Sequence, residues 1–430
     1  MPKLYNKTRI YRGALFVSMI CFFSCKEQQT EIKSITDYKL LERKSSITYT
    51  TEWAAVKKND AVYKRRLSND PDEIKSILGL ISLYINEARI TGNYDYYNAA
   101  AMTGIDQVLG MKPDQFEALT FKATILLSQH QFSSALLVAE EIKNKYPYNA
   151  YLYGIITDAE LELGNYEAAV ESAEKMISLR PDIRSYSRVA YLREIHGDLT
   201  GAIEAMKLAV DAGGPGDENT EWSRTQLGKL YEETGDTSNA IITYRIALQN
   251  RNMFPPALNG LARLALKEKN FVRALSLFKQ SDSIVSDHSS MEGIAAVYEA
   301  TDQTQSAEYI RQSIFDRMKV YAGNGAVPKP SGQNEDLEMA HACAGIGDYS
   351  NALKYALVEY NRRPGNIEVN ETVAMVYAKL GEFEKAVPYI ENAMRTNSKK
   401  GELISLAEQI YSQTGKIKSQ TTSKPVANIQ

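Results

Sequence analysis

The sequence predicts an all-α solenoid, an array of helical hairpins stacked one on the next. The chain has 430 residues, more than one compact core usually supports, so it holds several domains or a repeat array. A turn motif that ends in alanine recurs eight times along the chain. Twelve positions before each of these alanines stands a second residue, which is Ala or Gly in seven of the eight copies.

The composition excludes several classes of protein. Charged residues make up 24% of the chain and hydrophobic residues 44%, a globular balance that rules out bulk disorder. The formal net charge is −3, which gives no reason to expect a polyanionic partner such as nucleic acid. Only 3 Cys and 4 His are present, so a disulfide framework is excluded and few side chains remain for a metal site.

The first 25 residues have the pattern of a targeting segment. Four basic residues lie between positions 3 and 12, and residues 14–23 form an apolar run with a single Ser. As a helix this run would span about 15 Å, half of a ~30 Å hydrocarbon core, so it is not expected to cross a membrane. The run is followed by Ser24 and Cys25, and a small residue before Cys resembles a bacterial lipobox.

The lipobox resemblance implies that residues 1–24 are a lipoprotein signal peptide and that Cys25 carries the lipid. Two or three acyl chains would hold a protein on a membrane durably. Lys26 stands where some inner-membrane lipoproteins have Asp, so the outer membrane of a bacterial cell envelope is preferred to the inner membrane. A plain signal peptide, or an uncleaved anchor with an incidental Cys, stays open as an alternative.

Residues 25–72 are expected to connect the anchor to the folded array. Residues 26–52 are rich in Lys, Glu, Ser and Thr, which is typical of a solvated tether. Residues 53–69, which end before Pro71, are expected to form an amphipathic helix that covers the front of the array.

The repeats follow a lattice of small residues. The eight turn alanines are spaced by 34, 33, 38, 34, 33, 45 and 34 residues. They are Ala135, Ala169, Ala202, Ala240, Ala274, Ala307, Ala352 and Ala386. The residues twelve positions earlier are Ala123, Thr157, Ala190, Gly228, Ala262, Ala295, Ala340 and Ala374. Small side chains at two fixed points allow the two helices of a hairpin to cross closely.

This pattern resembles the tetratricopeptide repeat, a helix–turn–helix unit of 34 residues. One copy keeps most of the main positions, with Gly228 in the first helix, Gly235 in the turn, and Ala240, Tyr244 and Ala247 in the second helix. The resemblance implies a right-handed superhelical solenoid over residues 73–418, with eight clear units. Residues 73–115 are expected to form a divergent first unit, residues 401–417 a capping half-unit, and residues 419–430 a tail.

Two longer spacings mark insertions. Residues 213–220 and 321–334 contain several glycine and proline residues, so both segments are predicted to be loops. Each loop is expected to be either a tolerated surface insertion or a segment that folds over the groove and narrows it.

No motif of an enzyme is found, and the protein is expected to be neither an enzyme nor a binder of metals or cofactors. The sequence lacks the P-loop, the HExxH pattern, the GxSxG elbow and the CxxC pair. Cys343 occupies a position where other units have Tyr, so it is interpreted as a core residue.

The resemblance also places candidate ligand contacts on the concave face. In tetratricopeptide arrays, positions 2, 5, 9, 12 and 13 of each unit point inward. The residues at such positions are Tyr151, Asp158, Arg184, Tyr191, Glu194, Trp222, Lys229, Glu232, Asn259 and Arg263. This mixture of rings and charges suits an extended peptide or a helix. The Lys/Asn/Arg set with which some members of the family hold a chaperone C-terminus is not found.

One pair of charges is expected to be structural. Glu160 and Arg193 stand at equivalent, normally apolar positions of successive units. Because equivalent positions of neighbouring units stack, we expect a partly buried ion pair between them.

Three functions are compatible with these observations. The first is a membrane-anchored scaffold that binds a protein or peptide in the cell envelope through its concave groove. The second is an accessory lipoprotein that binds glycan or peptidoglycan, with Trp222 and the groove tyrosines as stacking platforms. The third is a non-catalytic subunit of an envelope enzyme or secretion complex.

Overall fold

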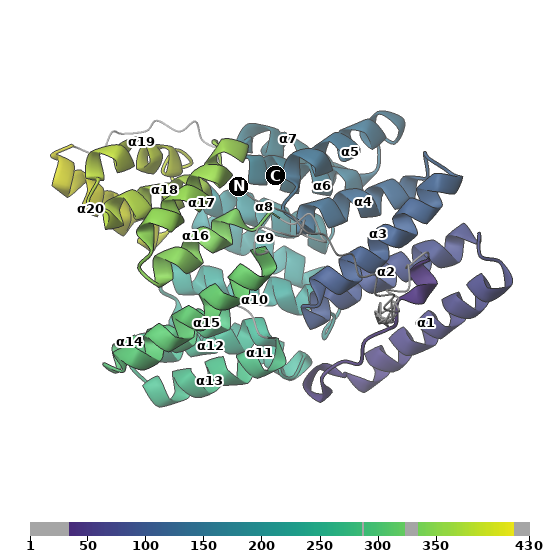
Figure 1. Cartoon of the computed structure of the whole chain (residues 1–430), viewed down its shortest axis with the longest axis horizontal. Helices are drawn as coiled ribbons and strands as arrows, with labels where there is room; N and C mark the ends of the chain where they lie inside the picture. The colour runs from purple at the N-terminus through teal and green to yellow at the C-terminus, as the bar shows by residue number, and fades with distance from the viewer. Residues whose placement is uncertain (1–33, 286–287, 323–333, 417–430) are drawn as a thin grey trace, which may run out of the picture.

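The computed structural model describes residues 34–285, 288–322 and 334–416 (Figure 1). These residues form 20 α-helices and two short 3₁₀ helices, and none of them lies in a strand. The predicted fold class, an all-α superhelical solenoid, is confirmed. The predicted signal peptide at residues 1–24, Cys25 and the predicted tail at 419–430 lie outside the described residues.

The helices pair in the order that the repeat lattice predicts. The chain begins with η1 (Ile35–Asp37), η2 (Ser45–Ile47) and α1 (Thr50–Asn69), and the divergent first unit is α2 (Ile74–Thr91) with α3 (Tyr94–Met111). The next four units are α4 (Phe116–Ser128) with α5 (Phe132–Lys145), α6 (Ala150–Leu163) with α7 (Tyr166–Leu179), α8 (Ile183–Ile195) with α9 (Leu199–Asp211), and α10 (Glu218–Glu233) with α11 (Thr237–Asn250). The last four are α12 (Pro255–Lys267) with α13 (Phe271–Ile284), α14 (His288–Ala300) with α15 (Thr304–Ala322), α16 (Asp336–Gly345) with α17 (Tyr349–Arg362), and α18 (Ile367–Lys379) with α19 (Phe383–Ala393), followed by α20 (Gly401–Thr414).

The lattice of small residues lies at the helix crossings. All eight turn alanines are completely buried, and so are six of their eight partners in the first helices. Of the other two partners, Ala295 is 2% exposed and Gly228 is buried against the Tyr244 ring. A larger side chain at these points would push the paired helices apart. The repeated alanines are therefore a packing requirement.

The turn between the two helices of a unit takes a left-handed backbone conformation whether or not glycine is present. Gly164 and Gly235 have φ values of 82° and 78°. In three units that lack glycine, His130, Lys269 and Asp302 adopt φ values of 55°, 60° and 57°. Packing of the helices therefore imposes this turn, since non-glycine residues enter it only at a cost.

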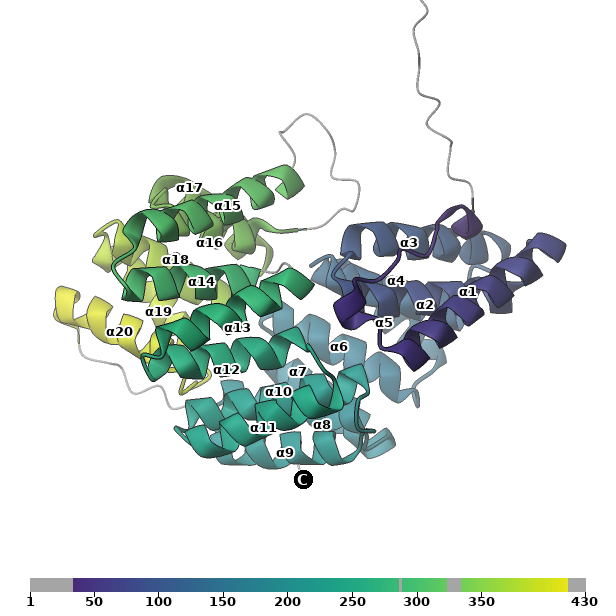
Figure 2. The same ribbon diagram turned by 90° about the horizontal axis from the view of Figure 1, so that it is seen from below.

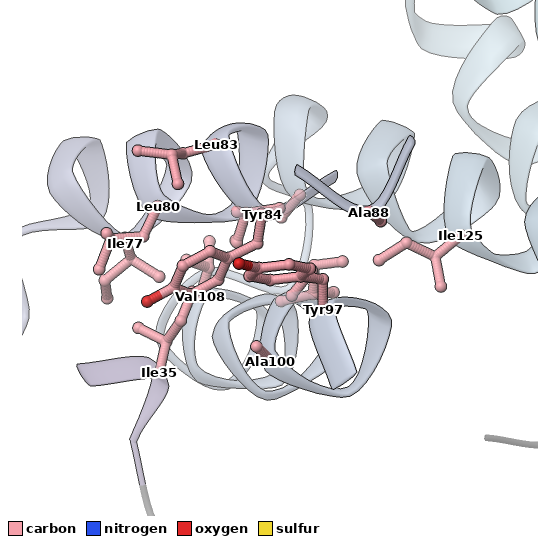
Figure 3. Packing of buried hydrophobic residues seen from close by; sticks show 14 of the residues in the cluster. Ile35, Ile77, Leu80, Leu83, Tyr84, Ala88, Tyr97, Ala100, Val108 and Ile125 are labelled. Atoms are coloured by element: carbon pink, nitrogen blue, oxygen red, sulfur yellow. The ribbon is translucent and has the colours of Figure 1, made fainter. Parts of the chain in front are cut away.

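The expectation of a solvated tether at residues 26–52 is wrong for the part that the structure describes. The side chain of Ile35 is completely buried, and its backbone N–H donates to Gln107 Oε1 at 2.9 Å. Figure 3 shows Ile35 in the apolar cluster of the first unit, beside the rings of Tyr84 and Tyr97. The many polar residues of this segment hid the few apolar side chains that anchor it.

The two ends of the array are capped as expected. Helix α1 packs on α2, and Leu67 near its end is 4% exposed. At the other end α20 packs on α19 and buries Leu403, Ala407 and Ile410. Each cap covers an apolar face that a neighbouring unit would otherwise cover.

The array curves so far that distant units meet. Followed by colour, the chain runs from α1 through α8–α11 and around a bend to α20 (Figure 2). Hydrogen bonds and ion pairs join residues that are 199 to 239 positions apart. These intervals correspond to about six or seven units of 34 residues. The contacts form two strips, which we call the N-terminal seam and the C-terminal seam.

The N-terminal seam joins residues 43–52 to residues 251–284. Arg251 Nη1 lies 2.9 Å from Glu52 Oε2, and its guanidinium carbon lies 4.0 Å from the centre of the Tyr49 ring. Tyr49 also donates to the Asn252 carbonyl at 2.9 Å. Glu52 in turn pairs with the buried Arg43. This seam therefore combines paired side-chain charges with an apolar cluster in which Ile47 packs with Leu258 and Ile284.

The C-terminal seam joins residues 129–197 to residues 334–397. Arg363 pairs with Glu162, and the Ile367 N–H donates to the Tyr166 hydroxyl at 2.9 Å. Arg395 donates to the Gly164 carbonyl, and a methyl group on Gly164 would overlap the carbonyl carbon of Gly365. Two backbones thus approach each other directly at this seam.

Within the described helices, none combines the length and apolar character that crossing a bilayer requires.

Candidate ligand groove

Three connected cavities follow the inner side of the bend between the N-terminal units and α10–α12. Their volumes are about 800, 450 and 310 Å³. Arg89 lines all three, and Trp222 lies between the second and the third. Residues of the N-terminal seam, among them Glu52 and Arg251, line the outer two. The seam therefore encloses a continuous groove.

We call the middle cavity, of about 450 Å³, the chamber. It brings together Tyr151 and Asp158 from α6, Arg184 and Tyr191 from α8, and Trp222 from α10. These are five of the residues expected on the concave face. They come from three successive units, because the first helix of each unit presents the same face to the inside of the bend.

One lattice position explains much of this convergence. We call the residue six places before the small residue of the first helix the inward position. Tyr151, Arg184 and Trp222 occupy it in their units and line the chamber. In other units Glu117 and Pro256 occupy it and line the two adjoining cavities. Asn334 also occupies it but lines a separate cavity at the C-terminal seam. The inward position therefore faces the groove in five successive units, from α4/α5 to α12/α13.

The charges of the chamber are only partly neutralised. Arg188 Nε lies 2.8 Å from Asp158 Oδ1, and Arg89 Nη2 lies 2.8 Å from Glu218 Oε2. The guanidinium carbon of Arg184 lies 5.1 Å from the centre of the Tyr151 ring, and no carboxylate of the described residues pairs with it. The chamber walls thus present one uncompensated cation beside aromatic rings.

Other predicted groove residues bind each other across units. Lys229 Nζ lies 3.4 Å from Glu194 Oε1, and Arg263 Nη2 lies 2.8 Å from Glu232 Oε1. In both pairs the carboxylate belongs to one unit and the cation to the next. These four charges therefore form a ladder that ties neighbouring units together, and they do not line the chamber.

The prediction for Asn259 is wrong, because the structure buries this residue. Its side chain is 4% exposed, and its Oδ1 accepts a hydrogen bond from Ser290 at 3.2 Å. Ser290 lies in α14, which packs over α12 at this point. Asn259 therefore satisfies a polar contact between units and is not open to a ligand.

The expected ion pair between Glu160 and Arg193 is also not formed. Arg193 Nη1 donates to the Gly201 carbonyl at 3.0 Å, and its Nε lies 4.0 Å from Asp198. Glu160 Oε2 accepts from Asn165 at 2.6 Å. Each side chain reaches the turn at the end of its own helix, so local contacts prevail over the contact between units.

Several contributors to the chamber were not identified from the sequence. Asn86 and Arg89 come from α2 of the divergent first unit, and Phe121 comes from α4, for which no groove residue was predicted. Arg188 stands at a position that the repeat does not assign to the groove. The spacing of Arg188 four residues after Arg184, on the same helix face, was the one available signal.

The first inserted loop lies at the groove. Gly213, Gly214 and Asp217 line the largest cavity, opposite α1 and α2. Most of the second insertion, residues 323–333, lies outside the described residues. Asn334, just after it, exchanges hydrogen bonds with Gln129 and His130 in the C-terminal seam.

The described residues offer little site chemistry besides binding. They include no group of three or more His, Cys, Asp or Glu side chains placed to hold a metal ion. Cys343 lies in the core, and burial raises the pKa of its thiol to about 11, which keeps it protonated. The interpretation of Cys343 as a packing residue agrees with this position.

Comparison with known sequences identifies individual units. The family model described as "Tetratricopeptide repeat" matches residues 150–183 and 367–400. These are the units α6/α7 and α18/α19, which meet at the C-terminal seam. Anaphase-promoting complex subunit 7 of Arabidopsis thaliana is 22% identical over 264 residues, which cover 60% of this chain and 45% of that protein. The chain therefore spans less than half the length of this relative.

Comparison with solved structures finds three chains that match this one in part. The anaphase-promoting-complex hetero-tetramer Cut9–Hcn1 contains a chain that is 13% identical, with a TM-score of 0.39, covering 78% of this chain and 62% of that one. A thermophilic TPR protein of Thermus thermophilus is 21% identical, with a TM-score of 0.37 and coverage of 44% and 97%. A tetratricopeptide repeat protein of Parabacteroides merdae is 19% identical, with a TM-score of 0.30 and coverage of 54% and 87%.

Proposed function

Because the chain carries tetratricopeptide repeats, we propose that it is a non-catalytic scaffold that holds a segment of a partner protein in its enclosed groove. We propose further that Cys25 carries a lipid that anchors the scaffold in a bacterial cell envelope, with the outer membrane preferred. Arrays of this kind offer an extended concave surface on which one long segment can bind.

The convergence of Tyr151, Arg184, Tyr191 and Trp222 on one chamber is the observation that carries the proposal. Trp222 is 40% exposed and Tyr191 is 36% exposed, although large aromatic side chains are usually buried in a packed array. Aromatic and arginine side chains in a cavity are typical centres of binding energy.

The test is cross-linking and pull-down from detergent-solubilised envelope, with wild-type and Trp222→Ala protein compared. Loss of a stoichiometric partner from Trp222→Ala is expected. Tyr309→Ala is the matched control, because Tyr309 is 72% exposed and lines none of the groove cavities. Equal recovery of every captured protein by Trp222→Ala would contradict binding in the groove.

The anchor is tested by metabolic labelling with an alkyne fatty acid and by membrane fractionation. Wild-type protein is expected to take up the label and to sediment with the outer membrane, and Cys25→Ala to do neither. Label on the Cys25→Ala protein would show that the lipid, if present, is attached elsewhere.

The exposed rings also favour the second candidate, a glycan-binding lipoprotein. The chain has two tryptophans, and Trp53 is 4% exposed, so a Trp53→Phe protein reports on Trp222 alone. Saturable quenching of its fluorescence by peptidoglycan fragments, without a protein partner in the pull-down, would favour this candidate over the scaffold.

A further inference from the structure

The inner wall of the bend carries two charges of opposite sign that lack a counter-ion. One is Arg184 in the chamber. The other is Glu368, which stands at the inward position of the unit α18/α19, six places before Ala374. Glu368 is exposed, and no cation of the described residues pairs with its carboxylate. The same lattice position therefore carries a cation at the chamber and a carboxylate in a unit near the other end of the array.

The C-terminal seam places Glu368 near the chamber. The preceding residue, Ile367, donates its N–H to Tyr166, and Asn366 donates to the Glu162 carbonyl at 3.0 Å. Residues 162 and 166 flank the turn between α6 and α7, and α6 supplies one wall of the chamber. The closed superhelix thus brings the carboxylate of Glu368 near Tyr191, which lines the chamber.

Tyr191 lies at the border between the two charges. It lines the chamber with Arg184, and burial together with the nearby carboxylates of Glu368, Glu162 and Glu194 raises its pKa well above 10. On the acidic side, Arg363 pairs with Glu162 and Lys229 pairs with Glu194. Glu368 remains as the uncompensated charge on that side, as Arg184 does in the chamber.

We propose that the segment held in the groove is bipolar, with an acidic side chain at Arg184 and a basic side chain at Glu368. The proposal rests on the scaffold function proposed above and specifies its ligand. An apolar side chain between the two charges would lie against Tyr151, Tyr191 and Trp222. The occupant is an extended internal segment of a protein and not a chain end, because cavities continue the groove on both sides of the chamber. Charge complementarity of this kind fixes the register of a bound segment and excludes segments of a single sign.

The test begins with selection of random 12-residue peptides displayed on phage against the full-length protein. Enriched peptides are expected to contain one acidic and one basic residue that flank an apolar one. Peptides that bind wild-type and Trp222→Ala protein equally would contradict the groove proposal itself. Groove-dependent peptides without both charges would overturn only the bipolar ligand.

Charge exchange then tests each contact separately with one selected peptide. Arg184→Glu should weaken binding of the peptide by about tenfold or more, and replacing the acidic residue of the peptide by Lys should restore most of the affinity. Glu368→Lys should be rescued in the same way by replacing the basic residue with Glu. Arg245→Glu is the matched control, since Arg245 is exposed on α11 and lines no cavity. Absence of rescue in both exchanges, with helical content unchanged by circular dichroism, would overturn the proposal.

Neutral variants guard against misfolding. Arg184 and Glu368 are each the second residue of a helix, where Glu is favourable and Lys is slightly unfavourable. Arg184→Gln and Glu368→Gln should therefore fold normally and lower the affinity of the bipolar peptide by a smaller factor. Unchanged affinity in both Gln variants would count against the proposal.

Discussion

The N-terminal and C-terminal seams join the superhelix across a similar interval of sequence, but their contacts differ. At the N-terminal seam, Glu52 lies between Arg43 and Arg251, and the buried Arg43 also binds Glu87. At the C-terminal seam, Gly164 and Gly365 bring two backbones into contact. The first seam is supported by a buried ion pair, Arg43 with Glu87, whose two charges must stay matched. The second includes a backbone contact that a side chain at position 164 would block. Mutations should therefore distinguish them.

The largest effect is expected from removal of the buried charge that supports the N-terminal seam. In Arg43→Met, Glu87, which is 1% exposed, loses its partner, and the free energy of unfolding should fall by about 3–5 kcal/mol. Urea unfolding followed by fluorescence of Trp53 measures the change, because Arg43 lies over this ring at 5.1 Å.

Two controls accompany this variant. Arg245→Met removes an exposed arginine and should change the free energy of unfolding by less than about 0.5 kcal/mol. Replacing both partners, Arg43→Met with Glu87→Leu, should recover much of the loss. A double variant as unstable as the single one would show that Arg43 acts through packing and not through charge.

The second largest effect is expected from a mutation that adds one methyl group at the C-terminal seam. In Gly164→Ala the Cβ would overlap the Gly365 carbonyl and would also stand in a left-handed conformation, at a cost of about 3 kcal/mol. Gly235 has the same conformation with open space around it, so Gly235→Ala should cost only about 1 kcal/mol.

Hydrogen–deuterium exchange of the amide of Ile367, which donates to Tyr166 across the seam, measures this opening. It should rise in Gly164→Ala and stay unchanged in Gly235→Ala. Equal protection in the two variants would show that the backbone contact does not hold the seam.

Acid should loosen the N-terminal seam selectively. Burial opposes ionisation of Glu52, but hydrogen bonds from Arg251 and Arg43 outweigh it and hold its pKa below the ordinary value of 4.5. The stabilisation is therefore complete above about pH 4.5 and is lost as the pH falls through the lowered pKa of the folded state.

Amide exchange around Tyr49 and Asn252, measured from pH 6 downward and corrected for intrinsic rates, should report this loss. Glu52→Gln should weaken the seam already at pH 6 and remove the acid dependence. An acid transition that persists unchanged in Glu52→Gln would assign it to another carboxylate.

The smallest change in the free energy of unfolding is expected from turn residues in a left-handed conformation. One such residue, Lys269, lies outside the seams, and another, His130, lies in the C-terminal seam. Lys269 holds a left-handed conformation, and Lys269→Gly should raise the free energy of unfolding by about 1 kcal/mol. His130 has the same conformation, but its ring nitrogen Nδ1 lies 2.9 Å from the Asn334 carbonyl across the C-terminal seam. His130→Gly should therefore gain nothing, because relief of strain is offset by the lost contact. Thermal unfolding of both variants tests the difference, and an equal gain would argue against a role of His130 in the seam.

The repeat lattice could be predicted from the sequence because it is periodic. Ala135 to Ala386 and their partners recur at fixed spacing, and each one packs within its own unit. The same periodicity placed Tyr151, Arg184 and Trp222 on the chamber wall. Contacts inside a unit, or between neighbouring units, leave a signal that repeats along the chain.

The seams could not be predicted, because their contacts occur once and join residues about 200 positions apart. Nothing near Arg363 in the sequence indicates Glu162 as its partner. The prediction that Asn259 faces the groove failed for a related reason. A repeat position that faces the groove in one unit can be covered by a helix of the following unit in another. The predicted ion pair between Glu160 and Arg193 is not formed, because each side chain lies near a helix end and binds groups close to the following turn.

The seams also bear on how such a chain can change by duplication. In an open array, unequal recombination can add or delete a unit, because each unit touches only its neighbours. Here the loss of one hairpin between α7 and α17 would bring a different unit opposite Glu162 and Gly164. The number of hairpins between the two strips is therefore set by geometry, and descendants of this chain should vary in length at its ends and loops before they vary in repeat count.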